Sequence, residues 1–439
     1  MRAFRAAAVS LALLAGGQLA GAPALVLAQP AAPAAVPAPE ARTPPRIVVA
    51  FANPPRTGVA VAGSTGSRYD GGDGYRLGQS ARQTARRVAA AYALREVASW
   101  PIRLLSMHCV VFEITDGRSA AEVLAALAKD SRVTLAQPLQ EFHTLTGATP
   151  PVAAPTGTAY NDPLYDLQTN LATLAIARAH QRSQGANVRI ALIDTAVDDR
   201  HPDLHGRIVR THSFVSTRSS ESLRHGTAMA GLIAAVANNR VGIVGIAPLA
   251  EVEVFEACWQ VAPGNDAATC NTFTLARALA AALASGAPLV NLSLAGPADP
   301  LLAALVQVGL KRGITFVGAA AGPDAPFPTG IPGVITAAGS EQPLPPGALA
   351  APAQHVLTLR PGGEYDFESG ASVAAAEITA VIALLMSASP THLDSGTIMG
   401  LLRSGSSGRS PAANAVDVNA ALARLDAQSG RAGLARAAP

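Results

Sequence analysis

The sequence predicts an α/β fold, with a larger domain over residues 161–425 and a small α+β domain over 46–144 ahead of it. In the larger region, apolar runs without polar alternation are typical of parallel strands buried on both faces. Helical stretches at 272–285 and 298–312 alternate with these runs, which indicates a three-layer domain with helices on both sides of the sheet. The smaller region has the order strand, helix, strand, strand, helix, strand, which predicts a ferredoxin-like split β-α-β sandwich. The runs expected as parallel strands are VRIALID, EVEVFEA, PLVNLSL and GITFVGAA.

Each element of the small domain has its own signal. RIVVAF predicts the first strand, a glycine-rich loop follows at 57–77, and a helical pattern covers 79–98. IRLLSM and CVVFEIT predict two further strands, and RVTLAQP predicts the last one. Between them, SAAEVLAALAKD predicts a helix capped by Ser119, with Glu122 three residues later.

Segments of biased composition separate these domains. Residues 1–28 contain two arginines, an apolar stretch and a small-residue cleavage site, which predicts a secretory signal and a secreted or periplasmic protein. A membrane anchor is the alternative, but glycines and a proline interrupt the apolar run and no stop-transfer charges follow. Residues 29–45 and 145–160 are rich in proline and small residues and are expected to be linkers, and 426–439 is expected to be a tail.

Composition excludes some kinds of partner. The chain has 33 Lys and Arg against 30 Asp and Glu, for a net charge of +3, and no run of basic residues. We therefore expect no nucleic-acid partner. No segment after the signal offers the roughly 20 uninterrupted apolar residues that a membrane span requires.

The three cysteines have different settings. Cys258 and Cys270 flank a short polar loop with a proline and a glycine, and in an exported protein this arrangement predicts a disulfide. Cys109 lies in an apolar strand and is expected to be a buried free thiol.

Three stretches carry residues suited to nucleophilic catalysis. Asp194 ends a buried strand, His225 stands at the entry to a helix, and Ser372 opens another helix. Together they supply a nucleophile, a base and a carboxylate that orients the base. Each alone has a simpler interpretation: Ser372 and Asp194 as helix caps or turn residues, and His225 as a helix-end histidine. A metal site is a further alternative for one acidic loop, which contains Asp198, Asp199, His201 and Asp203.

Taken together, these stretches resemble the subtilisin-like serine proteases, or subtilases. The family's Asp-x-Gly-x-x-x-x-His-Pro-x-Leu block corresponds to 194–204, and its His-Gly-Thr-x-x-Ala-Gly block is matched fully by 225–231. Its Gly-Thr-Ser-x-Ala-Ala-Pro block corresponds to 370–376, and VGIVGIAP resembles the family's connector. The resemblance covers roughly 161–425 and implies a catalytic triad of Asp194, His225 and Ser372.

The resemblance also implies partners. NLSLAGP resembles the segment that lines the substrate cleft, and 46–144 more loosely resembles the propeptide that chaperones and inhibits these enzymes. Protein or peptide substrates and the chain's own propeptide are therefore the expected partners. Calcium is common in the family, but the sequence offers no acidic cluster to assign to it, and no cofactor or metal ligand is identified. The residues expected to face substrate are Ser293, Leu294, Ala295 and Gly296.

Four positions depart from the family pattern. Ala196, Ala371 and Ala376 replace a glycine, a threonine and a proline, and small residues remain at these places. The fourth departure affects the oxyanion hole: where the family has an asparagine, this chain has Pro323, which has no N–H to donate. Asp324 follows and is the alternative donor, beside the Ser372 backbone N–H.

The sequence thus predicts a secreted serine endopeptidase made as a zymogen, slowed by the missing asparagine. The alternative is an exported pseudoprotease that binds or regulates. A lipid or sugar hydrolase finds no support, because GASVA is not the Gly-x-Ser-x-Gly elbow.

Overall fold

A computed structural model describes residues 44–54, 79–145, 159–216, 223–260, 268–341, 343–403 and 415–437. The expected signal, the glycine-rich loop, and nearly all of the two expected linkers lie outside these residues.

The N-terminal sheet is antiparallel, with strand order β2-β3-β1-β4 and two helices, as the ferredoxin-like prediction requires. The helix α2 begins at a capping box in which Ser119 Oγ accepts from the Glu122 N–H and the Glu122 carboxylate accepts from the Ser119 N–H. This cap confirms the prediction for that helix. The elements are β1 (Arg46–Ala52), α1 (Gln79–Ala91), β2 (Leu94–Ile102), the 3₁₀ turn η1 (Arg103–Leu105), β3 (Met107–Ile114), α2 (Ala120–Leu127) and β4 (Leu135–Pro138).

Two expectations in this domain are wrong in part. The helix predicted over 79–98 ends at Ala91, and β2 begins at Leu94. Half of the expected strand IRLLSM is the turn η1. Alanine and leucine in this stretch favour a helix locally, but these residues pair with β3 from Leu94 to Ile102, with a bulge between Glu96 and Ala98. Tertiary pairing overrides local propensity here.

The larger domain contains a seven-stranded sheet in which every neighbouring pair is parallel. All four predicted strands are present in it, and PLVNLSL also supplies the short strand β12 (Leu294–Ala295). In sheet order the strands are β15 (Leu349–Ala351), β14 (Ile335–Gly339), β13 (Thr315–Ala319), β11 (Leu289–Leu292), β6 (Arg189–Asp194), β8 (Glu251–Glu256) and β7 (Ile208–Ser213).

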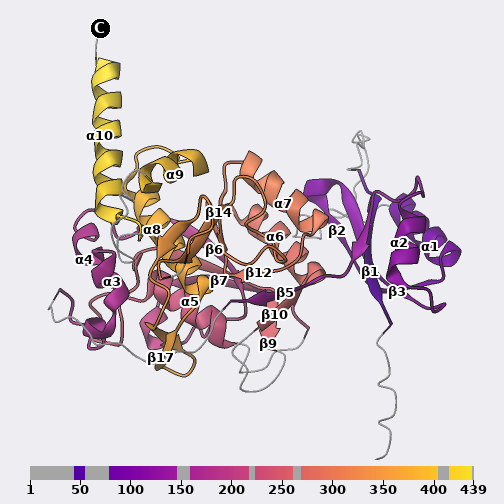
Figure 1. Cartoon of the computed structure of the whole chain (residues 1–439), viewed down its shortest axis with the longest axis horizontal. Coiled ribbons are helices and arrows are strands. Elements are labelled where there is room, and N and C mark those ends of the chain that lie inside the picture. The colour runs from indigo at the N-terminus through magenta and orange to yellow at the C-terminus, as the bar shows by residue number, and fades with distance from the viewer. Residues whose placement is uncertain are drawn as a thin grey trace, which may run out of the picture. The chain divides into compact units, whose positions relative to one another are not determined.

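Helices cover both faces of this sheet (Figure 1). On one face, α5 (Arg224–Ala234) and α8 (Ala371–Ala388) pack in one apolar core, and on the other α6 (Thr272–Ser285) and α7 (Pro300–Lys311) pack in a second. The two helices predicted from periodicity are therefore confirmed. The layers place the carboxyl ends of the strands, where Asp194 lies, beside the start of both α5 and α8.

A second, smaller antiparallel sheet has the order β12-β5-β10-β9 and combines distant parts of the chain. Its strands β5 (Glu141–Thr144), β9 (Cys258–Gln260) and β10 (Ala268–Asn271) accompany β12. The remaining elements are η2 (Tyr165–Leu167), α3 (Thr169–Thr173), α4 (Ile176–Ala179), η3 (Pro202–Leu204), β16 (Val356–Arg360), β17 (Glu364–Glu368), α9 (Ser395–Arg403) and α10 (Val418–Ala437). The stretch expected as a tail thus continues the helix α10.

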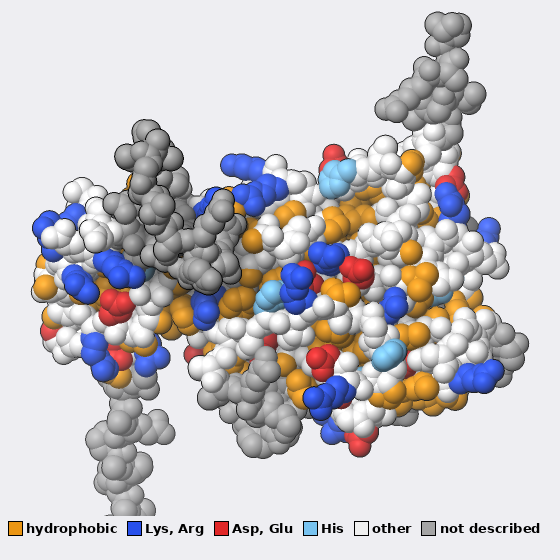
Figure 2. Space-filling model, turned by 180° about the vertical axis from the view of Figure 1, so that it is seen from behind, with side chains coloured by type: hydrophobic (Ala, Val, Ile, Leu, Met, Phe, Trp, Pro, Cys, Tyr) orange, Lys and Arg blue, Asp and Glu red, His pale blue; other side chains and the backbone are white. Residues whose placement is uncertain are grey.

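Among the described residues, α8 alone is long and apolar enough to cross a membrane, yet most of it is buried inside the fold, as expected of a core helix. On the face shown in Figure 2, basic and acidic side chains are interspersed and no patch of one sign dominates.

Candidate active site

Asp194 and His225 form a buried pair at the carboxyl end of β6. The Nδ1 atom of His225 lies 2.7 Å from Asp194 Oδ1, which also accepts from the Thr195 N–H at 2.6 Å. Their side chains are 1% and 3% exposed. The carboxylate therefore fixes the orientation of the imidazole, and Nε2 is the ring nitrogen that remains available for a further contact.

The glycine after His225 allows the start of α5 to lie close to the end of β6. A Cβ on Gly226 would lie 2.6 Å from the Ala196 carbonyl oxygen and 2.7 Å from that of Thr195, so only glycine fits. The Gly226 N–H instead donates to Thr195 Oγ1 at 2.8 Å, which ties the start of α5 to the end of β6.

The electrostatic setting of His225 has opposing contributions. Burial lowers its pKa, but the charge of Asp194, the hydrogen bond to it and the charge of Glu368 raise the pKa, and the net direction is upward from 6.5. His225 Nε2 has no hydrogen-bond partner among the described residues.

Ser372 lies in the first turn of α8 and is completely buried. Gly370 is the N-cap of this helix and no side chain caps it, so the cap interpretation of Ser372 is wrong. Ser372 Oγ donates to the Ser293 carbonyl at 2.8 Å and accepts from the Leu145 N–H at 3.0 Å. The nucleophile candidate is thus hydrogen-bonded to a peptide segment and not to His225.

Polar contacts join β11 to α8 below this point. Asn291 accepts from Thr379 Oγ1 at 2.8 Å and donates through Nδ2 to Ser293 Oγ at 2.8 Å. Ser293 Oγ in turn donates to the Ser372 carbonyl at 3.1 Å. These buried hydrogen bonds fix the height of Ser372 relative to the sheet.

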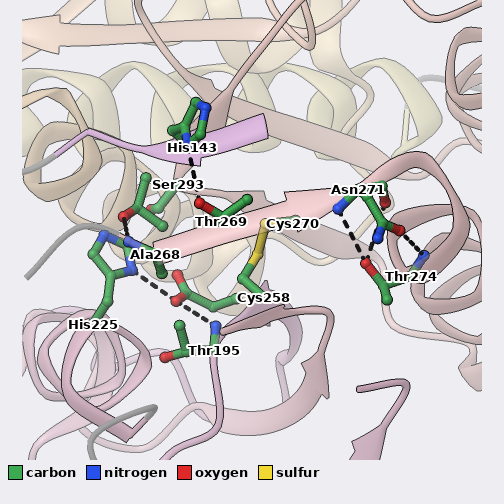
Figure 3. The surroundings of a disulfide bond; sticks show 12 residues. His143, Thr195, His225, Cys258, Ala268, Thr269, Cys270, Asn271, Thr274 and Ser293 are labelled. Atoms are coloured by element: carbon green, nitrogen blue, oxygen red, sulfur yellow. Dashed lines mark hydrogen bonds and ion pairs between the residues drawn. A yellow bond between two sulfur atoms is a disulfide. The ribbon is translucent and has the colours of Figure 1, made fainter. Parts of the chain in front are cut away.

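The strand β5 lies between β10 and β12 like a bound peptide. On one side His143 pairs with Thr269 and Phe142 with Cys270, and on the other Thr144 pairs with Leu294. His143 Nδ1 and Thr269 Oγ1 form a hydrogen bond 3.1 Å long (Figure 3). The next residue, Leu145, reaches Ser372: its carbonyl oxygen accepts from the Ser372 N–H at 3.3 Å.

Phe142 is the buried anchor of this strand. Its ring lies edge-on to Phe327 with centroids 5.2 Å apart, and it is fully buried. A Cβ on Gly296 would collide with the Phe142 ring, so the glycine makes room for it.

Residues 185–417, slightly more than half of the chain, match the family model described as the Subtilase family. The chain belongs to the subtilase family. Members of this family are serine endopeptidases.

Individual relatives agree with the assignment. The chain is 30% identical to thermitase of Thermoactinomyces vulgaris over 243 residues, which are 52% of this chain and 85% of thermitase. It is 29% identical to subtilisin E of Bacillus subtilis (strain 168) over 228 residues, 47% of this chain and 57% of that relative.

A solved structure extends the likeness of the fold. The crystal structure of fervidolysin from Fervidobacterium pennivorans, titled a keratinolytic enzyme related to subtilisin, matches with a TM-score of 0.66 and 20% identity. The match covers 87% of this chain and 61% of that one. This subtilase thus has the subtilisin-like fold that its sequence predicts.

The proposed oxyanion site of this subtilase has few hydrogen-bond donors. Pro323 and Asp324 lie exposed in the loop after β13, and neither side chain donates a hydrogen bond to the Leu145 carbonyl. Within the described part of the chain, that oxygen has the Ser372 N–H as its one donor.

The acidic loop that suggested a metal site does not assemble one. No three His, Cys, Asp or Glu side chains in the described residues are grouped to hold a metal. Asp203 accepts instead from Asn239 Nδ2 and the Ile243 N–H, both at 2.8 Å. Burial raises its pKa to about 6.

The disulfide and the free thiol predicted from the cysteines are both present: Cys258 bonds Cys270, and Cys109 is buried and unpaired. Residues 141–145 are the part of the site that the sequence reasoning missed, since 141–144 were assigned to the small domain and Leu145 to a linker. Glu141–Thr144 alternates exposed and buried side chains, a strand signal too short to reveal its partners.

Proposed function

We propose that this subtilase is an exported serine endopeptidase made as a zymogen, and that it matures by cutting its own chain after Leu145. The segment before that bond is called the prosegment below. The secretory signal predicted at 1–28 supports export, and the ferredoxin-like domain with β5 supports a role for the prosegment as chaperone and inhibitor.

The position of Leu145 is the observation that carries the proposal. Its carbonyl oxygen is 3.3 Å from the Ser372 N–H, and its own N–H is 3.0 Å from Ser372 Oγ. The preceding four residues pair with strands on both sides, which is how an extended peptide binds by strand addition. These contacts of Leu145 support the peptide bond that follows it as the one that Ser372 attacks.

The residues present can perform acyl transfer after one rotation. Ser372 Oγ now donates to the Ser293 carbonyl, so turning its side chain toward His225 Nε2 would allow the base to take the proton. Ser372 then attacks the Leu145 carbonyl carbon, and Asp194 stabilises the imidazolium that forms. His225 returns the proton to the leaving amine, and water later releases the acyl group.

Turnover is slow in this account because one donor of the oxyanion hole is missing. The Ser372 N–H remains, but Pro323 offers no hydrogen where a side-chain amide is expected. Subtilisin itself supplies the known magnitude for this loss, about 10²–10³ in kcat. A tethered substrate tolerates a slow enzyme, because the bond to be cut is already in place.

The substrate class is proteins and extended peptides. A cavity of about 220 Å³ lies beside the start of α8 and is a candidate pocket for a substrate side chain. Its lining is largely small: Ala320, Ala321, Gly322, Ala338, Gly339, Pro343, Pro345, Ala353, Gln354, Gly370 and Ala371. Calcium remains an inference from the family alone.

The test is the mass and N-terminal sequence of the protein produced in a protease-deficient host. We expect wild type to yield a form beginning at Thr146, and Ser372→Ala to accumulate the signal-free precursor. Maturation of the Ser372→Ala protein at the same bond would contradict self-cleavage.

An exported pseudoprotease is the second candidate, favoured by Pro323 and by the Ser372 hydroxyl donating to Ser293 and not to His225. In that case the site would retain the prosegment or another peptide and never cut it. Wild-type protein that stays full-length while binding an extended peptide would favour this candidate.

A further inference from the structure

The disulfide Cys258–Cys270 crosses the hairpin that receives β5. Cys258 and Cys270 are directly opposite each other in β9 and β10, and both are completely buried. On its other edge, β10 pairs with β5, where Cys270 is opposite Phe142. The disulfide therefore lies in β10, the strand that pairs with β5, at the position opposite Phe142.

The same disulfide reaches back to the triad. Cys258 follows Ala257, whose N–H donates to the Asp194 carbonyl at 2.8 Å. Figure 3 shows the bond between the two strands, with His225 and Thr195 on one side and the capping pair Asn271 and Thr274 on the other. It thus links the backbone beside the catalytic carboxylate to the peptide-binding strand.

Apart from this bond and β5, the pairing of β10 within its sheet is short. It has four residues, its partner β9 has three, and two-stranded hairpins of this size are marginal in water. At its end Asn271 caps α6, accepting from the Thr274 N–H at 3.0 Å. When β5 departs, β10 loses its pairing on that edge and keeps the short pairing with β9.

We propose that the Cys258–Cys270 disulfide is a positioning element that holds β10 ready for extended peptides, so that cleavage of such peptides depends on the oxidised hairpin. This rests on the proposed endopeptidase function and adds to it a determinant of substrate length and a redox dependence. The dependence is greatest for the residue that takes the place of Phe142, because that residue is opposite Cys270.

The redox step needs a dithiol. Its thiolate attacks one sulfur of the disulfide, the Cys258–Cys270 bond breaks, and a mixed disulfide forms. The second thiol of the reductant resolves it, which leaves two protein thiols and an oxidised reductant. Phe142 is opposite Cys270 while β5 is in place, so the precursor is expected to resist reduction better than the mature enzyme does.

Hydrogen exchange in the full chain tests the positioning role without requiring activity. In a Ser372→Ala background, which prevents self-cleavage, Cys258→Ala/Cys270→Ala is compared with the parent and with Cys109→Ala. We expect amides of 141–143 and 269–271 to exchange about tenfold faster or more without the disulfide. Over the labelling times at which β5 and β10 exchange, the amides of β11 should stay protected in all three proteins. The proposal would be overturned if β5 and β10 exchanged at the same rate with and without the disulfide. It would also be overturned if loss of the disulfide accelerated exchange in β11 by the same factor.

Kinetics of the mature enzyme tests the consequence. The substrates are amides of Glu-Phe-His-Thr-Leu, the sequence of 141–145, and of Thr-Leu, each with the same chromogenic leaving group. Loss of the disulfide should lower the ratio of kcat/KM between long and short substrate about tenfold or more, mainly through KM. An unchanged ratio would overturn the proposal. A wild type that cleaves neither amide would refute the endopeptidase function, and exchange would still decide the role of the disulfide.

Discussion

The two sides of the site next to Ser372 differ in burial and in hydrogen bonding. On one side, Asp194, His225 and the strands β10 and β12 are buried and joined by hydrogen bonds. On the other side, the loop 320–325 is largely exposed and contributes no donor to the Leu145 carbonyl. In the proposed function, the first side would supply proton transfer and peptide binding, while the second would lack part of the stabilisation of the transition state. Such a site should bind well and react slowly.

Phe142→Ala is the strongest test of the buried side, which includes β10 and β12. Removing a fully buried aromatic ring costs about 3 kcal/mol or more, which corresponds to about a hundredfold in affinity. We expect the separately added prosegment peptide to inhibit the mature enzyme about a hundredfold more weakly when it carries this change. An unchanged inhibition constant would mean that β5 does not anchor the prosegment. Glu141→Ala serves as the control, because that side chain is exposed.

Pro323→Asn tests the exposed side, which is the loop 320–325. Restoring an amide donor should raise kcat about tenfold or more with little change in KM, since the gain lies in the transition state. Steady-state kinetics on a peptide amide checks this. A wild type as fast as the variant would indicate that another group already donates to the oxyanion.

The pH dependence tests His225. Only neutral His225 can accept the Ser372 proton, and its pKa is raised, so activity should increase as pH rises through a value above 6.5. Below that value kcat/KM should fall about tenfold per pH unit. Glu368→Gln removes one of the charges that raise the pKa and should shift this limb to lower pH. A limb below pH 6.5 in wild type would contradict the assigned electrostatics.

Asp324→Asn should have the smallest effect. The carboxylate is exposed and makes no hydrogen bond to the peptide segment in the described structure, so we expect rates within about twofold of wild type. A large increase in kcat would place position 324, and not 323, at the oxyanion.

How far the sequence predicts this site depends on how local each signal is. Asp194, His225 and Ser372 stand in motifs whose small residues, such as Gly226, are required by close packing. The cap at Ser119 is equally local. Strand β2 was missed because its pairing with β3, and not its composition, determines its structure.

The position of β5 was missed for a related reason. Its partners β10 and β12 lie more than a hundred residues away along the chain, and four residues give no periodicity that identifies them. Register of that kind comes only from the assembled fold.

Labelling with a serine-directed fluorophosphonate tests most directly whether this sparse site still activates its nucleophile. We predict that purified mature protein is labelled at Ser372, that Pro323→Asn is labelled faster, and that His225→Ala is not labelled. Folded wild-type protein that resists the probe at every pH, with its prosegment removed, would contradict the account and identify a pseudoprotease.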